Sequence, residues 1–433
     1  MNRVVTVLAI LAISACTSLP GRPISPEDWF QQGVAFLQSW QYDQAIGAFS
    51  AAIELNPQYS EAYLNRGLAW AGKGDLDKAI SDYNKALEIN PEDEKAYSSR
   101  GLAWARKGEY EQAISDYTKA LDLNPEDSQS YYHRSAALAD KGDLDRGLAD
   151  AEKALSLEPD NSAYAELVRT LKAKIADRGE ERFQRGVSLL NSGRYPEAIK
   201  VFTEAIELKP GYAQAYLNRG LAWAGKGDFD KAISDYTKAL EINPKDGEAY
   251  RSRGLAYRKK GKLDQAITDF SEALKVNPKD SQSYSNRAIA WTEKGDFDRA
   301  IADYSEALEL NPKDARAYTN RGFTWLKKDN LDQAISDFTK AIKIDPRAAQ
   351  AYNNRGIAWA QKGDLDQAIS DFTMALEINP SYAQAYSNRG VTWAEKGELE
   401  SGLTDAKKAL SLEPKNKSYQ SIVTYMEEQI GKQ

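Results

Sequence analysis

Residues Tyr63 to Gly74 read YLNRGLAWAGKG, and the same string returns unchanged from Tyr216 to Gly227. Within each of the two series formed by this segment and its variants, neighbouring copies start 34 residues apart. Self-similarity at a fixed period of about 20 to 50 residues is typical of proteins in which one structural unit stacks on the next. The variants begin at Tyr97, Tyr250, Tyr284, Tyr318, Tyr352 and Tyr386.

A proline marks the end of every repeat. When each unit is numbered so that this proline stands at position 32, the chain contains eleven units, four at residues 26–161 and seven at 179–416. Proline cannot continue a helix, so each of these positions predicts a helix boundary. The prolines are Pro57, Pro91, Pro125, Pro159, Pro210, Pro244, Pro278, Pro312, Pro346, Pro380 and Pro414.

The first half of the unit at 60–93 predicts one helix and its end. Tyr63, Gly67 and Trp70 are spaced at i, i+4 and i+7, which places them on one face of a helix. Gly74 suits the left-handed conformation that ends a helix, and Asp75 suits the residue that caps the start of the next one. We therefore expect a tight turn at these two residues.

The second half of the same unit predicts a second helix. Ala79, Tyr83 and Ala86 mark its buried face, and Pro91 prevents it from continuing. The small residues on the facing sides of the two helices allow close approach of their backbones. Each unit is therefore expected to be a helix–turn–helix pair.

This pattern resembles the tetratricopeptide repeat. Shared features are an aromatic residue at positions 4, 11 and 24, Gly at 8, Ala at 20 and 27, and Pro at 32. The resemblance implies an all-α fold, a right-handed α-solenoid of about eleven helix-turn-helix repeats in two arrays. It also implies that the first helices line a concave groove that binds protein or peptide segments.

Two segments fall outside the repeats. Residues 162–178 read as a single helix without a partner, and residues 417–433 look the same. The units before them share a departure at position 20, where Gly147 and Gly402 replace alanine. We expect each array, 26–161 and 179–416, to end in a polar capping helix that covers its last apolar face. The sequence is compatible with one continuous superhelix and with two separate ones.

The first fifteen residues predict an export signal. Arg3 precedes a largely apolar run from Val4 to Ile13, which small residues follow. The run is shorter than the roughly 20 residues that a membrane-spanning helix needs. Residues 1–15 are therefore expected to be a signal peptide.

The end of this run, Ile13-Ser14-Ala15-Cys16, resembles the bacterial lipobox. The resemblance implies that Cys16, the only cysteine in the chain, becomes the acylated (palmitate-bearing) first residue of a lipoprotein. Residues 16–25 would then be a lipidated tether, and Thr17 favours the outer membrane by analogy with enteric lipoproteins. The alternative is ordinary cleavage and secretion without a lipid.

Composition argues against other classes of protein. The net charge of −7 and the mixed signs along the chain give no basic stripe for nucleic acid. One cysteine and one histidine, His133, cannot form a Cys/His zinc site. Gly67 to Gly74 fits the first part of a phosphate loop but lacks the following Ser or Thr and lies in a predicted helix. We therefore expect no enzyme activity, cofactor, metal or small-molecule substrate.

Asparagine recurs at position 6 and is the candidate for binding. In tetratricopeptide folds this position faces the groove, and the series resembles the asparagine ladder with which O-GlcNAc transferase holds extended polypeptide. An amide side chain offers both donors and acceptors to a peptide backbone. The alternative is that Asn is merely tolerated on a polar helix face. The candidate residues are Asn65, Asn218, Asn286, Asn320, Asn354 and Asn388.

Three further rows are expected to be structural. Tryptophan at position 11 reads as buried core. Apolar residues at position 9, such as Leu68 and Phe323, would form either the groove floor or, as we prefer, contacts between neighbouring first helices. Arg at position 7 recurs in ten units and Asp at position 23 in nine, which predicts an Arg–Asp ladder that sets the stacking angle.

Together these features predict a lipid-anchored scaffold or assembly factor of the bacterial cell envelope. It would bind polypeptide segments in its groove and face the periplasm or the cell exterior. The alternative function is an adhesin-like ligand on the cell surface that recognises molecules of a host or a neighbouring cell.

Overall fold

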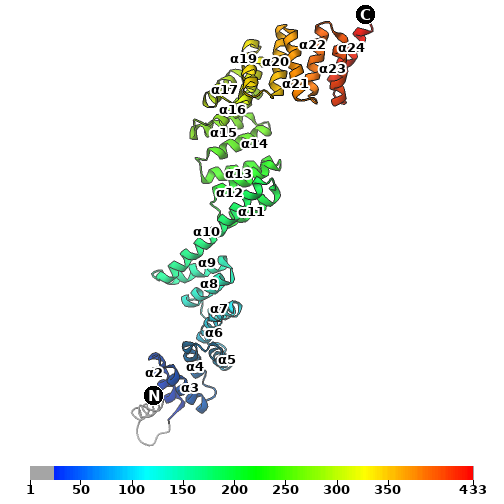
Figure 1. The fold of residues 1–433 in the computed structure, drawn as a ribbon. Coiled ribbons are helices and arrows are strands. Elements are labelled where there is room, and N and C mark those ends of the chain that lie inside the picture. Colours follow the sequence, from blue (N-terminus) through cyan, green and yellow to red (C-terminus); the bar gives the residue numbers. More distant parts are fainter. Residues whose placement is uncertain (1–23, 433) are drawn as a thin grey trace. The chain divides into compact units, whose positions relative to one another are not determined.

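The structure is a computed structural model that describes residues 24–432, and these form 23 helices and no strand (Figure 1). The predicted all-α repeat fold, an α-solenoid of paired helices, is therefore confirmed. The chain divides after Arg178 into two compact units. Cys16 and the predicted signal peptide lie outside the described residues, so the lipid anchor stays a prediction.

The first unit contains four helix pairs. In each pair the first helix packs against the second, and the second packs against the first helix of the next pair. The pairs are α2 (Pro26–Gln38) with α3 (Tyr42–Leu55), α4 (Ser60–Lys73) with α5 (Leu76–Ile89), α6 (Glu94–Arg106) with α7 (Tyr110–Leu123), and α8 (Ser128–Lys141) with α9 (Leu144–Leu157).

The second compact unit continues the same pattern through the seven sequence repeats at 179–416. After α11 (Tyr195–Leu208) the pairs are α12 (Ala213–Gly225) with α13 (Phe229–Ile242), α14 (Gly247–Lys259) with α15 (Leu263–Val276), α16 (Ser281–Lys294) with α17 (Phe297–Leu310), α18 (Ala315–Lys327) with α19 (Leu331–Ile344), α20 (Ala349–Lys362) with α21 (Leu365–Ile378), and α22 (Ala383–Glu395) with α23 (Leu399–Leu412), followed by α24 (Lys417–Ile430).

Helix α10 runs without interruption from Ser162 to Asn191. The capping helix predicted at 162–178 is therefore not a separate helix, because it continues into the first helix of the next repeat. The physical reason is that the segment contains no proline, and Gly179 is not among the glycines with positive φ. The first part of α10 places Val168 and Leu171 against α9.

The turn inside each unit follows the predicted chemistry. Gly74 adopts φ 92° and ends α4, and the Asp75 side chain accepts a hydrogen bond from the backbone N–H of Lys78 at 3.2 Å. Glycine occupies the same left-handed position in nine units, whereas Trp40 and Asp329 hold it in the other two with φ near 60°. Side chains are strained in this conformation, so these two turns lack the freedom that glycine gives the others.

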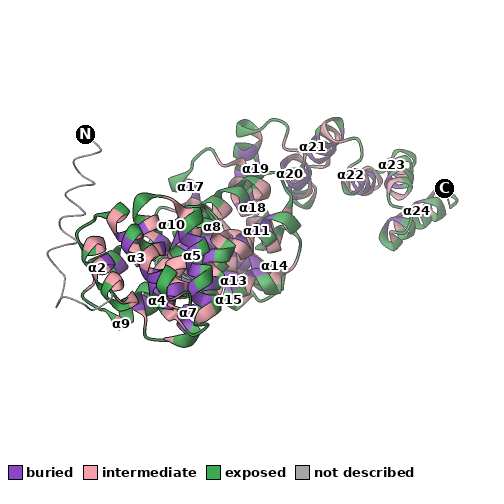
Figure 2. Ribbon diagram, turned by 90° about the horizontal axis from the view of Figure 1, so that it is seen from below, coloured by how far each residue is buried: buried purple, intermediate pink, exposed green. Residues whose placement is uncertain are grey.

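The core lies between the paired helices. Buried residues recur between exposed ones along the helices that can be followed in Figure 2. Ala79, Tyr83 and Ala86 are fully buried, as predicted. A Cβ atom at Gly67 would lie 2.6 Å from the ring of Tyr83, which explains why glycine stands there. The tyrosine ring thus fills the space that the missing side chain leaves.

The last repeat of each array makes an ion pair with the helix that follows it. Glu152 pairs with Lys172 of α10 at 2.8 Å, and Lys407 pairs with Glu427 of α24 at 2.8 Å. Beneath the second pair, Val423 and Met426 of α24 are buried against α23. Each array end is therefore held by apolar burial and by a surface ion pair. The acidic residue belongs to the repeat at the first end and to the following helix at the second.

Among the described residues, no helix combines the length and apolar character required to cross a lipid bilayer.

Candidate functional site

The six predicted asparagines fall into three structural classes. The side-chain amides of Asn65 and Asn218 each donate to a carbonyl four residues earlier in their own helix, at 2.8 Å. One N–H of each amide is therefore engaged within its own helix. For these two residues the bonds favour the alternative, a polar residue tolerated on a helix face.

A second class forms a side-chain network. Asn388 donates to Asn353 at 2.9 Å, and Asn353 donates to Asn354 at 3.2 Å. Asn353 stands at position 5 and was not predicted as a site residue, although it is buried. The adjacent asparagines at 353 and 354 were the signal that could have identified it. This network joins α20 to α22 and leaves fewer free polar atoms for a partner.

The third class consists of Asn286 and Asn320. Within residues 24–432 neither side-chain amide has a hydrogen-bond partner, and both line one cavity of about 310 Å³. The cavity lies between α16 and α18, and we call it the amide cavity. Its lining residues are Gln282, Ser285, Asn286, Ile289, Asp314, Arg316, Ala317 and Asn320.

The polar atoms of the amide cavity are largely unused by the protein. The Ser285 hydroxyl is buried and has no partner among the described residues, and Arg316 makes no ion pair there. Asp314 is the exception, since its carboxylate accepts from the N–H of Ala317 at 3.0 Å and caps α18. Unsatisfied buried polar groups are costly, so this cavity is suited to a ligand that supplies donors and acceptors.

An apolar row at position 9 runs beside the asparagines. Leu68, Leu102 and Phe323 are 37%, 40% and 38% exposed, and the other members are half-buried. The exposed fractions of these three residues favour the groove floor over the preferred interpretation, contact between neighbouring first helices. The first helices of successive units touch only slightly, because the intervening second helix separates them. The row forms part of the surface, which favours the groove-floor alternative.

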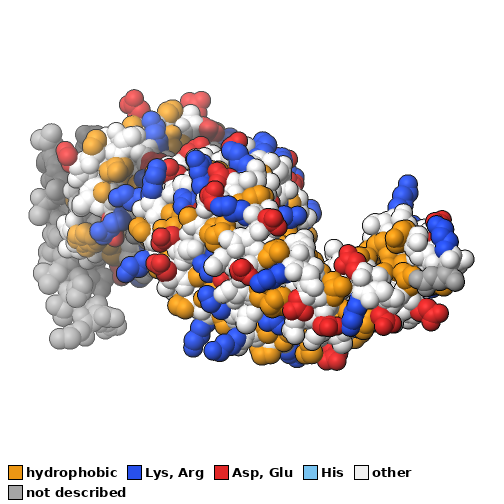
Figure 3. All heavy atoms as spheres, turned by 90° about the horizontal axis from the view of Figure 1, so that it is seen from above, with side chains coloured by type: hydrophobic (Ala, Val, Ile, Leu, Met, Phe, Trp, Pro, Cys, Tyr) orange, Lys and Arg blue, Asp and Glu red, His pale blue; other side chains and the backbone are white. Residues whose placement is uncertain are grey.

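Charges of both signs are interspersed on the outside of the molecule, and Figure 3 shows no broad area of one sign on the face in view. Part of this pattern comes from lysines at position 14 that pair with an acidic residue of the preceding unit. Examples are Lys73 with Asp43 and Lys362 with Asp332, each at 2.5 Å. Surface pairs of this kind contribute little to stability.

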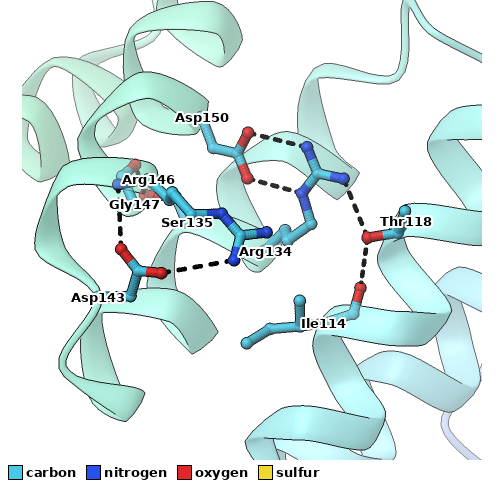
Figure 4. Close-up of polar contacts among 8 residues, drawn as sticks. All are labelled: Ile114, Thr118, Arg134, Ser135, Asp143, Arg146, Gly147 and Asp150. Atoms are coloured by element: carbon cyan, nitrogen blue, oxygen red, sulfur yellow. Dashed lines mark hydrogen bonds and ion pairs between the residues drawn. The ribbon is translucent and has the colours of Figure 1, made fainter.

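The predicted Arg–Asp pairing is confirmed in nine units. In each pair two guanidinium nitrogens donate to the two carboxylate oxygens, as Arg134 does to Asp150 at 2.6 and 2.9 Å (Figure 4). The carboxylate partner raises the pKa of the arginine, which therefore stays charged. The pairs are Arg66–Asp82, Arg100–Asp116, Arg134–Asp150, Arg219–Asp235, Arg253–Asp269, Arg287–Asp303, Arg321–Asp337, Arg355–Asp371 and Arg389–Asp405.

The third nitrogen of each of these arginines reaches back to the preceding unit, a contact that the sequence analysis missed. Arg134 donates to the hydroxyl of Thr118 at 3.1 Å, and Thr118 in turn donates to the carbonyl of Ile114 at 2.7 Å (Figure 4). The acceptor always stands at position 25. A detectable signal was that Ser, Thr or Asn occupies this position except in the last unit of each array, where Glu152 and Lys407 stand.

The tryptophans at position 11 were predicted to be buried core, and the structure packs them against the core but leaves them half-buried. Trp70 packs against the core on one side, and Lys78 lies over its ring at 4.3 Å from the centroid. Position 11 lies near the turn, where lysines of the same unit cover the outer face. The fully buried aromatic residues are instead those at position 24, such as Tyr83 and Phe338. The side chains at positions 4 and 11 therefore lie at the edge of the core, and the aromatic side chain at position 24 fills its centre.

His133 is packed between aromatic rings. It stacks on Tyr117, with ring centroids 5.9 Å apart, and meets Tyr132 edge-on at 5.3 Å. Burial lowers the pKa of His133, because desolvation disfavours the charged imidazole. The neutral form and the aromatic contacts fit a packing role at a position where other units have Asn or Ser.

No cluster of three or more His, Cys, Asp or Glu side chains suited to a metal ion occurs in the part of the chain that the structure describes.

Family models described as "Tetratricopeptide repeat" match most of the chain. One matches residues 30–94, 183–247 and 251–322, a second matches 94–127, 315–347 and 349–382, and a third matches 128–161. No curated protein matched the chain.

Three solved structures illustrate the likeness to known folds. YrrB, titled a TPR protein with an unusual peptide-binding site, is 27% identical, with 42% of this chain and 95% of YrrB covered and a TM-score of 0.38. MamA is 30% identical, with 38% and 96% covered and a TM-score of 0.36. A tetratricopeptide repeat protein of Parabacteroides merdae is 21% identical, with 58% and 99% covered and a TM-score of 0.48.

Proposed function

Because the chain belongs to the tetratricopeptide repeat family, we propose that it is a protein interaction scaffold that binds extended polypeptide segments along its first helices. The observation that carries this proposal is the amide cavity. Asn286 and Asn320 present free donors and acceptors there, one repeat apart, and the apolar row runs beside them. Such a surface is suited to a peptide backbone and to adjacent apolar side chains.

The family also supports a non-catalytic role, since the tetratricopeptide fold is typically an interaction scaffold. Binding to the backbone would make recognition tolerant of sequence. Specificity would then come from pockets elsewhere along the first helices that accept particular side chains.

We expect Asn286→Ala combined with Asn320→Ala to weaken binding of short peptides about 10- to 100-fold. Each lost hydrogen bond contributes about 0.5–1.5 kcal/mol, and the two act on one segment. The measurement is fluorescence anisotropy with a labelled library of capped nine-residue peptides, titrated with the full chain.

A matched control is Asn65→Ala combined with Asn218→Ala. These amides already donate within their own helices, so affinity should change less than twofold. Equal losses in the two variants, or unchanged binding by the folded Asn286/Asn320 variant, would refute the role of the amide cavity.

The second part of the proposal concerns location. The lipobox-like segment supports anchoring of the scaffold through Cys16 to a membrane of the bacterial envelope, with the outer membrane favoured by Thr17. Several acyl chains on one residue give stable attachment where a single chain is marginal. The repeats would then recruit or assemble envelope proteins at that surface.

Cys16→Ala is expected to release the protein from the membrane fraction, because the lipid-bearing side chain is lost. Cell fractionation followed by immunoblotting measures this. Cys16→Ser removes the same sulfur with a smaller change in size and should also release the protein from the membrane fraction. Retention of either variant at the wild-type level would refute lipidation.

Protease treatment of intact cells distinguishes the periplasmic scaffold from the adhesin-like alternative. A periplasmic scaffold should be protected until the outer membrane is opened, whereas a surface ligand should be cleaved at once.

A further inference from the structure

A second cavity, of about 460 Å³, lies at the C-terminal end of the second unit, between α22, the start of α23 and α24. Val391, Ala394 and Glu395 come from α22, and Leu399 begins α23. The α24 residues that line it are Ser418, Ser421, Ile422, Tyr425 and Met426.

This end pocket continues the repeat face that carries the amide cavity. If Lys417 is counted as position 1, Ser418, Ser421, Ile422 and Tyr425 occupy positions 2, 5, 6 and 9 of α24. The amide cavity uses the same four positions of α16. The asparagine of position 6 is thus replaced by Ile422, and the aliphatic residue of position 9 is replaced by an aromatic one.

The end pocket is apolar with one charged group. Tyr425 is 58% exposed, which is unusual for a large apolar side chain, and Met426 is buried at the floor. The Ser421 hydroxyl is satisfied, since it donates to the carbonyl of Lys417 at 3.0 Å. Glu395 is exposed and makes no ion pair with any residue in 24–432, so its carboxylate is open to a partner.

An aromatic ring, an aliphatic floor and a free carboxylate match a side chain with an apolar stem and a cationic end. Lys and Arg bury their methylene stems on apolar surface, and their charged ends bind carboxylates and aromatic faces. The pairing of Lys with Trp rings elsewhere in this chain uses the same chemistry. The overall net charge of −7 also favours a basic segment.

We propose that the end pocket binds a lysine or arginine side chain of the polypeptide segment held on the first helices. This inference rests on the proposed function. It adds the class of residue that is recognised in the bound segment, a basic one, and the place where that residue binds. The amides of Asn286 and Asn320 would hold the backbone of such a segment, and the end pocket would select for a basic residue.

The experiment compares labelled twenty-residue peptide libraries that carry arginine, citrulline or glutamate within three residues of either end, because three repeats separate the end pocket from Asn286 and Asn320. The full chain is the receptor. Citrulline has the shape of arginine without its charge. The arginine library should bind about five- to thirtyfold more tightly than the citrulline library. In Glu395→Gln and in Tyr425→Leu this ratio should fall at least threefold.

Glu395→Lys gives a stricter readout, because it should reverse the preference from the arginine to the glutamate library. The matched control is Glu398→Gln, an exposed carboxylate three residues further on that does not line the pocket, and it should leave the ratio unchanged. Circular dichroism of each variant checks that it is folded.

The outcomes separate the two claims. If peptides bind and depend on Asn286 and Asn320 but show no preference for arginine, the end-pocket inference is overturned and the proposed function stands. If no library binds the wild-type chain, both fail. A preference that survives in Glu395→Lys, or a Tyr425→Leu variant that changes only the oligomeric state, also overturns the inference, the latter in favour of a second copy of the chain.

Discussion

Replacing Asp337 by alanine is expected to lower the free energy of unfolding of the α18–α19 region by about 3–5 kcal/mol. The Asp337 side chain is 2% exposed, and both of its oxygens accept hydrogen bonds from Arg321, whose side chain is 16% exposed. Without the carboxylate, a largely desolvated guanidinium would keep its hydrogen bond to Ser305 in the preceding unit and its contact with the Tyr318 ring, but no counter-charge. The loss comes mainly from leaving this charge unpaired.

The control for this prediction is Asp298→Ala. Asp298 pairs with Lys328, but its side chain is 79% exposed, so the expected loss is below about 1 kcal/mol. Native-state hydrogen exchange is the suitable measurement, because long repeat arrays do not unfold as one cooperative unit. Equal changes in exchange protection for the two variants would show that burial of the Arg–Asp pair is not what matters.

The second large effect is expected for Phe338→Ala, which should cost about 3–5 kcal/mol in the same region. The ring is fully buried and fills the space next to Gly322, where a Cβ atom would lie 2.8 Å from it. Truncation would leave a cavity between α18 and α19 that the backbone cannot close.

Trp325→Ala provides the comparison within the same hydrophobic cluster. Tryptophan is the larger residue, but Trp325 is half-buried, and the burial free energy follows the apolar area removed from water. The expected loss is about 1–2 kcal/mol. A greater loss for Trp325→Ala than for Phe338→Ala in hydrogen exchange would contradict the assignment of position 24 as the centre of the core.

The sequence predicted the repeat fold closely because each unit carries its own stop and start signals. Gly74, Asp75 and Pro91 act through local backbone geometry, which does not depend on distant contacts. The interruption of the repeat at 162–178 was also predictable. The continuity of α10 was not, because a continuous helix is distinguished from a restarted one only by the lack of a stop signal in the sequence.

The Arg–Asp ladder was predictable because the two residues recur together at fixed positions. Its third contact was missed because Ser, Thr and Asn at position 25 are also ordinary surface residues of a helix. Burial at position 11 was overestimated for a related reason. Periodicity identifies the face on which Trp70 lies, but not how far a neighbouring lysine, such as Lys78, leaves its ring uncovered.

For the candidate site, the sequence identified six equivalent asparagines but could not rank them. Their differences come from neighbours at other positions. Asn354 and Asn388 are engaged because Asn353 stands between them, whereas Asn286 has Ser285 in that place and stays free. Side-chain hydrogen bonds of this kind depend on three-dimensional proximity that a single position in a repeat does not encode.

The ion pairs at the two array ends have a consequence for how these arrays can be rearranged. Lys172 and Glu427 stand at the same position of their respective helices, and they meet residues of opposite charge, Glu152 and Lys407. Exchanging the first part of α10, residues 162–178, with α24 would therefore oppose two carboxylates at one array end and two ammonium groups at the other. Interior repeats share the same arginine and position-25 contacts, so recombination could duplicate or delete them without breaking these contacts. The segment that ends each array is matched in charge to that array alone.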